Sequence, residues 1–129
     1  MKKFDIEFRH QDRRGKMYYF KFKGKNHLII FSVKGAPRGG HYHRKDQTHI
    51  ILSGSFFLRV INVKTKKVEV QKKIKSGDVV TIKAYRSHLF VALEDSLMIE
   101  YWKGNYKSID YPPERKIVKD FLKGKAFKV

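Results

Sequence analysis

The chain has 129 residues, of which 41% are hydrophobic, with no cysteine and a formal net charge of +18. This length suits a single domain over residues 1–129, and the missing cysteine excludes disulfides, thiolate metal sites and a cysteine nucleophile. No apolar run is long enough for a secretory signal or a membrane span, so we expect a cytoplasmic protein with no membrane partner.

Short apolar segments alternate with turn residues about every ten positions, which predicts an all-β sandwich or barrel. We expect strands at residues 4–9, 17–23, 27–33, 41–44, 48–52, 55–63, 67–74, 79–82, 89–93 and 97–102. One short helix is expected near the end, where Pro112 and Pro113 preset the first turn and Gly124 stops the helix. Its apolar stripe consists of Ile117, Val118, Phe121 and Leu122.

Charge and strand composition indicate the expected partners. The excess of 30 Lys and Arg over 12 Asp and Glu favours an anionic ligand or substrate. The lysines are spread along the chain without a long block, which is typical of a solvated surface rather than of a nucleic-acid arm. The strand at residues 17–23 is rich in Tyr and Phe, and such a strand at an open edge would pair with another chain. We therefore expect a homodimer in which this strand pairs with or covers the partner.

Histidines supply the candidate site. Residues i and i+2 of a strand point to the same face, so His41 and His43 project two imidazoles side by side. His88 follows a predicted strand after a short connection that returns the chain to the barrel wall. We expect these three rings to converge on one pocket inside the barrel. The same interior should be lined by Ile50, Leu52, Val79 and Val80. Three imidazoles in an apolar lining indicate a use beyond packing, because unpartnered polar groups are costly to bury.

The spacing around these histidines is specific. Two groups of residues define it: Gly35, His41, His43, Gln47 and Gly54, and then Gly77 and His88. This spacing resembles the two motifs of the cupin superfamily, over residues 35–102. The resemblance implies a cupin-type double-stranded β-helix, or jelly-roll, barrel. It would be completed by N-terminal strands within residues 4–33 and by a C-terminal tail and short helix within 103–129.

The same resemblance implies a divalent metal ion, such as zinc, manganese, iron or nickel. Its ligands would be His41, His43, Gln47 and His88. The amide oxygen of Gln47 is a weaker ligand than the carboxylate usual at this position, but three histidines still make a metal site with an open position. His49 has the strand parity of Gln47 and could replace it. The histidines could also act without a metal, as acid and base.

A narrower resemblance concerns activity. The runs Arg38–His43 and Leu52–Phe56 are similar to cupins that isomerise or epimerise nucleotide-linked ketosugars. This implies an enzyme acting on a nucleotide-linked or phosphorylated sugar, with His41, His43 and His88 as catalytic acid/base groups. The predicted substrate-binding residues near the barrel mouth are Arg38, Tyr85 and Arg86. The alternatives are a metal-dependent cupin such as a dioxygenase, and a non-catalytic module that binds a small anionic ligand or RNA.

Overall fold

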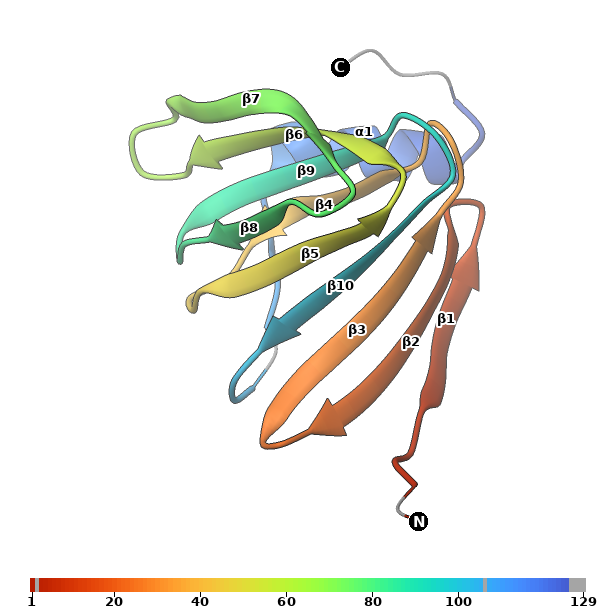
Figure 1. The fold of residues 1–129 in the computed structure, drawn as a ribbon. Coiled ribbons are helices and arrows are strands. Elements are labelled where there is room, and N and C mark those ends of the chain that lie inside the picture. The colour runs from red at the N-terminus through yellow and green to blue at the C-terminus, as the bar shows by residue number, and fades with distance from the viewer. Residues whose placement is uncertain (2, 106, 126–129) are drawn as a thin grey trace.

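Two antiparallel sheets face each other in the computed structural model, which describes residues 1, 3–105 and 107–125 (Figure 1). The larger sheet has six strands in the order β1 (Glu7–Asp12), β2 (Gly15–Phe22), β3 (Lys25–Ser32), β10 (Ser96–Trp102), β5 (Gln47–Ser53) and β8 (Val79–Ile82). The smaller sheet has five strands in the order β11 (Ile109–Asp110), β4 (Pro37–Tyr42), β9 (Arg86–Ala92), β6 (Ser55–Asn62) and β7 (Val68–Lys75). The predicted all-β jelly roll is confirmed.

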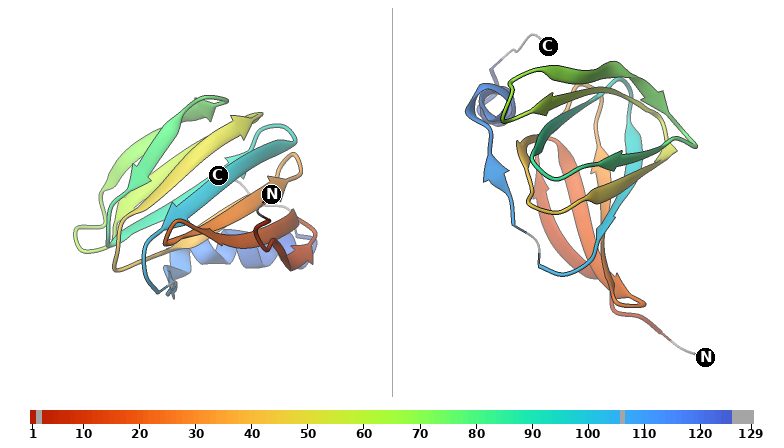
Figure 2. Two further views of the ribbon diagram at one scale, coloured as in Figure 1. Left: turned by 60° about the horizontal axis from the view of Figure 1, so that its bottom comes forward. Right: turned by 90° about the vertical axis from the view of Figure 1, so that its left-hand side faces the viewer.

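The core lies between the two sheets. Inward positions recur every second residue, as the strand period requires. The six-stranded sheet buries Ile30, Ile51 and Met98, and the five-stranded sheet buries Phe56 and Phe90 against them. Figure 2 shows that the sheets curve around this interior as the two walls of a flattened barrel. Polar side chains inside the barrel are therefore surrounded by apolar ones.

One helix, α1 (Pro112–Leu122), covers the outer face of the five-stranded sheet (Figure 2). Val118 packs against Leu89 and Val91 of β9, which point away from the main core. The buried carboxylate of Glu114 accepts two hydrogen bonds from Arg59 of β6, at 2.6 and 2.7 Å. This confirms the predicted C-terminal helix. Among the residues that the structure describes, no helix has the length and apolar character needed to cross a bilayer.

Four details of the predicted strands were wrong. β4 begins at Pro37 rather than at residue 41, because two glycines form a bulge inside the strand instead of a bend before it. The strand at residues 17–23 is not an edge, since β1 pairs along it and forms the edge itself. In β5 the core residue is Ile51, whereas Ile50 is only partly buried and Leu52 is 44% exposed. In β8 the same alternation leaves Val79 62% exposed, and Val80 packs against the core instead.

Candidate active site and metal centre

Strands β4 and β9 place two histidines directly opposite each other. His41 of β4 is the register partner of His88 in β9, and opposite residues of an antiparallel pair share a face. The bulge precedes His41, where Gly39 and Gly40 have φ of 101° and 71°, a region that favours glycine. His43 comes two residues after His41, just past the end of β4. Local backbone geometry thus directs all three imidazoles inward.

The three rings meet in one place. Ring centroids lie 4.8 Å apart for His41 and His43, 5.0 Å for His41 and His88, and 5.4 Å for His43 and His88. One nitrogen of each ring lies within 4.8 Å of the corresponding nitrogens of the other two. A single small ligand or metal ion can therefore touch all three side chains.

Backbone carbonyls fix the orientation of two of these rings. Nδ1 of His43 donates to the carbonyl of Lys107 at 2.8 Å, and Nδ1 of His88 donates to the carbonyl of Arg86 at 3.2 Å. A carbonyl only accepts, so in each ring Nδ1 carries the proton and Nε2 is the nitrogen that can ligate. Metal-binding histidines are commonly held by this type of contact.

All three imidazoles are neutral at physiological pH. Burial, together with the adjacent His49 and His43, lowers the pKa of His88 to about 3. Burial likewise places the pKa of His41 well below 6.5, with a contribution from His88. The pKa of His43 is also lowered, mainly by burial. A neutral imidazole is the protonation state that binds a metal.

Gln47, the remaining predicted ligand, lies on β5 of the opposite sheet. It is 3% exposed and lines a small recess together with His43 and Trp102. Its Oε1 atom is buried and makes no hydrogen bond to any residue that the structure describes. A buried amide oxygen without a donor is a candidate ligand atom, since leaving it unpartnered costs about 1–3 kcal/mol.

A buried acid–histidine pair stands beside the three histidines. His49 of β5 and Glu100 of β10 are register partners, with Nε2 of the histidine 3.6 Å from Oε2 of the glutamate. The His49 ring lies 5.6 Å from the His88 ring. Burial raises the pKa of Glu100, but His49, together with His88 and His43, lowers it by more, so the net shift is downward.

Sequence reasoning missed Glu100. The signal was available in β10, where Glu100 has the parity of the buried residues Met98 and Trp102. A single carboxylate on the core face of an apolar strand is expensive unless it is partnered, and therefore indicates a function. The sequence predicts that His49 could share the site of the other histidines or replace Gln47 as a ligand. The structure places His49 at the cavity that His41 and His88 line and pairs it with this carboxylate.

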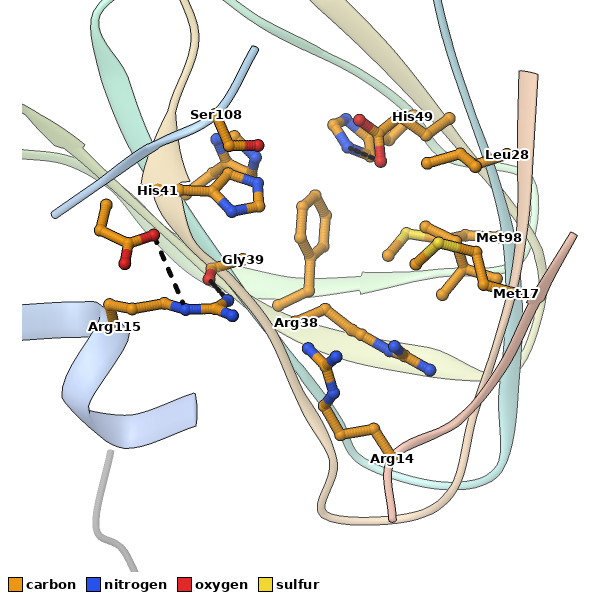
Figure 3. A pocket seen from close by; sticks show the side chains of 15 residues that line it. Arg14, Met17, Leu28, Arg38, Gly39, His41, His49, Met98, Ser108 and Arg115 are labelled. Carbon is orange, nitrogen blue, oxygen red and sulfur yellow. Dashed lines mark hydrogen bonds and ion pairs between the residues drawn. The ribbon is translucent and has the colours of Figure 1, made fainter. Parts of the chain in front are cut away.

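A cavity of about 250 Å³ opens beside these groups (Figure 3). The side chains of His41, His49, His88 and Glu100 contribute to its polar lining. Its apolar lining includes Phe90 and Met98, and three arginines also reach it: Arg14, Arg38 and Arg115. The cavity thus combines imidazoles, one carboxylate and several cations within a largely apolar wall.

Of the three predicted substrate-binding residues, only Arg38 lines this cavity. Arg86 donates to Glu69 at 2.9 Å and lines a separate recess next to β7 and β8. Tyr85 lies against Tyr42, with ring centroids 6.1 Å apart. The structure therefore does not bring Tyr85 or Arg86 into the cavity that His41 and His88 line.

Two cationic residues of the cavity were not predicted. Arg14 stands in the turn between β1 and β2, and Asp12 holds it through a contact of 2.7 Å. Arg115, on α1, donates to the carbonyl of Gly39 at 2.8 Å. A Cβ atom on Gly40 would lie only 2.7 Å from the Arg115 backbone, so glycine lets the helix approach β4. Both arginines reach the cavity through tertiary packing that a local pattern does not reveal.

Comparisons with known proteins bear on this architecture. No protein-family model and no curated protein matches the sequence. Similar solved structures include the capsular polysaccharide assembling protein CapF from Staphylococcus aureus, at 17% identity and a TM-score of 0.70. That match covers 82% of this chain and 34% of CapF, so the chain spans about a third of the length of CapF.

Two further structures match over most of both chains. KdgF from Halomonas sp. has 18% identity and a TM-score of 0.65, covering 78% of this chain and 88% of KdgF. An RmlC-like cupin from Shewanella frigidimarina NCIMB 400 has 20% identity and a TM-score of 0.61, covering 81% of this chain and 86% of that chain. The chain has the cupin fold, which confirms the fold implied by the sequence resemblance.

Proposed function

We propose that this protein is a metal-dependent cupin enzyme, an isomerase or epimerase that moves a proton next to the carbonyl group of an anionic sugar. The observation that carries the proposal is the meeting of three imidazole nitrogens within 4.8 Å, where two of the rings, His41 and His88, line a cavity that also holds a buried His–Glu pair. Phosphorylated sugars, nucleotide-linked sugars and sugar-derived acids are the substrate classes to test. The similarity to CapF, a capsular polysaccharide assembling protein, supports a carbohydrate substrate.

The donor set fits a divalent ion. His41, His43 and His88 are neutral, and carbonyl acceptors hold the Nδ1 protons of two of them away from the site. Oε1 of Gln47, which has no hydrogen-bond partner among the described residues, is available as an additional oxygen ligand. Imidazole suits zinc, iron and nickel, and the added oxygen makes manganese reasonable as well. When bound, such an ion polarises a carbonyl oxygen as a Lewis acid.

Proton transfer is assigned to His49 and Glu100, which belong to the six-stranded sheet on the opposite side of the cavity. An imidazole with a pKa near 3, as in His88, is too weak a base for an efficient proton abstraction near neutral pH. We therefore assign His41, His43 and His88 to ligation rather than to the acid/base role predicted for them. His49 takes up the proton from carbon and returns it, at Nδ1, which has no hydrogen bond to any described residue. Glu100 orients the His49 ring through Nε2 and stabilises its charged form.

Metal content and solvent exchange together test this function on the full chain. Protein purified without a polyhistidine tag should contain about one divalent ion per chain by elemental analysis. His88→Ala should lose the ion. His27→Ala should keep it, because His27 lies outside the cavity and stacks on Phe20.

The activity assay uses sugar phosphates, nucleotide-linked ketosugars and sugar-derived keto acids in D₂O. The metal-loaded protein should exchange the proton next to the carbonyl of at least one of them for deuterium, as followed by NMR. Chelator-treated protein should not. A protein that binds no divalent ion, or that exchanges no proton of any compound when loaded, contradicts the proposal.

A further inference from the structure

Arg38 is a buried cation without an anionic partner among the described residues. The residue is 4% exposed. Nε of Arg38 donates to Oγ of Ser32 at 3.0 Å, and Nη2 donates to the carbonyl of Phe31 at 2.7 Å. Both acceptors are neutral, and Nη1 makes no hydrogen bond to any residue in the described part of the chain. A guanidinium in this position has lost its hydration without gaining a counter-charge, which is costly.

The neighbourhood of Arg38 adds a second cation. Burial, together with the charge of the nearby Arg14, lowers the pKa of Arg38 to about 10. Arg38 nevertheless stays charged at neutral pH. The nearby carboxylate, Asp12, is committed to Arg14 through Nε and Nη2 contacts of 3.1 and 2.7 Å. Two guanidinium groups therefore stand beside one carboxylate, which contacts only Arg14 of the two, and a positive charge remains at this end of the cavity.

The remaining carboxylates of the cavity are also occupied. Glu100 faces His49 at 3.6 Å, and Asp110 faces Arg115 at 3.8 Å. In Figure 3 the guanidinium groups of Arg14 and Arg38 lie together on one side of the cavity, and His49 lies on the opposite side. A molecule that reaches the imidazoles can thus present an anionic group to Arg38.

We propose that Arg38, with Arg14 beside it, binds the carboxylate of a small organic acid of about monosaccharide size, whose reacting end faces the histidines. This inference rests on the proposed function and narrows its substrate class. Arg38 gives two of its five N–H donors to protein acceptors, so three remain, which suits the two oxygens of a carboxylate better than the many oxygens of a diphosphate. The volume of about 250 Å³ lies below the usual range for drug-sized ligands, about 300–1,000 Å³, and excludes an enclosed nucleotide.

Calorimetric titration of the full metal-loaded chain tests this inference with four probes that have the same type of sugar ring and differ in the anionic group attached to it. The probes are D-glucuronate, D-glucose, glucose 6-phosphate and UDP-glucose. D-Glucuronate should bind at least about tenfold more tightly than each of the other three, because it alone places one carboxylate on a compact ring. Arg38→Gln should weaken D-glucuronate at least about tenfold and leave D-glucose unchanged.

A matched control and a second variant keep the result interpretable. Arg9→Gln removes an exposed arginine on β1 that does not line the cavity, and should leave D-glucuronate binding unchanged. Arg38→Lys keeps the charge but not the planar fork, so it should fall between wild type and Arg38→Gln, and it replaces that variant if Arg38→Gln fails to fold. Thermal unfolding checks the folding of each variant.

A failure of the carboxylate site can be distinguished from a failure of the proposed isomerase function. Equal binding of D-glucuronate and D-glucose, tightest binding of UDP-glucose, or unchanged binding in both Arg38 variants overturns the inference. These results would leave metal binding and proton exchange untouched. Conversely, Arg38-dependent binding of D-glucuronate by a protein that exchanges no substrate proton supports the carboxylate site while the isomerase assignment fails.

Discussion

The two sheets make different contributions to the same cavity. The five-stranded sheet supplies His41 and His88 as cross-strand partners, with His43 just beyond β4, and all three are neutral. The six-stranded sheet supplies a pair that carries charge, His49 and Glu100, which are also cross-strand partners. Neutral nitrogens on one wall suit ligation, whereas a histidine backed by a carboxylate on the other wall suits proton transfer. The fold thus allows metal binding and acid–base chemistry to be changed separately.

The largest expected effect is a difference between a substitution in the five-stranded sheet and one in the six-stranded sheet. His88→Ala should weaken divalent-ion binding by more than about 100-fold, because it removes a ligand. His49→Ala should keep the ion and lower the proton-exchange rate by about 10²–10⁴-fold, because it removes the proton-transfer group. Metal titration and deuterium incorporation measure the two quantities on the same samples. Loss of the ion in both variants would show that the walls do not act separately.

Glu100→Gln tests whether the charge of Glu100 supports proton transfer by His49. The amide keeps the size of the side chain but removes the charge that stabilises protonated His49. We expect the exchange rate to fall about 10- to 100-fold with little change in metal affinity. The pH dependence of the rate should change as well, which a purely structural role would not produce. An unchanged rate and pH profile would remove Glu100 from the mechanism.

The buried, neutral histidines His41, His43 and His88 should make the stability of the metal-free protein sensitive to acid. Folding lowers the pKa of His88 from 6.5 to about 3. Between these values the unfolded chain binds a proton that the folded chain does not, so the free energy of unfolding decreases as the pH falls from about 6.5 towards 3. The loss approaches about 1.4 kcal/mol per pH unit for each such group.

Urea unfolding of chelator-treated protein at several pH values measures this slope. His88→Gln removes one of the titrating groups and should reduce the slope, with His41 and His43 supplying the rest, whereas His27→Gln should keep the slope of the wild type. A wild-type free energy of unfolding that is constant between pH 6.5 and pH 5 would show that His88 titrates normally in the folded chain.

The outer faces of the sheets also differ, and this concerns assembly. Helix α1 covers the five-stranded sheet, whereas Phe8 and Phe31 are 55% and 39% exposed on the six-stranded one. Phe8 contacts Tyr18, which contacts Phe31. We expect a homodimer through this face and the β1 edge. Phe8→Lys should weaken dimerisation at least about tenfold in analytical ultracentrifugation, with little change in protomer stability. A wild-type protein that is monomeric at micromolar concentration would contradict this.

Sequence reasoning reached the fold and the neutral wall because both depend on local patterns. Strand alternation and turn spacing predicted the sheets, and the two-residue period placed His41 and His43 on one face. The charged wall was missed because its members belong to strands distant in sequence, β5 and β10. Parity in β5 was misjudged because Ile50, Ile51 and Leu52 are consecutive apolar residues, which give no alternation. Arg14 was missed because it belongs to a surface turn that only the folded barrel brings to the cavity.

The central claim is that three histidines of one wall hold a single divalent ion. X-ray absorption at the zinc edge of the zinc-loaded protein tests it most directly. The account predicts three imidazole nitrogens at about 2.0–2.1 Å from the ion, and loss of specific binding in His88→Ala. Fewer than three imidazole ligands in the wild type, or an unchanged spectrum in His88→Ala, would contradict it.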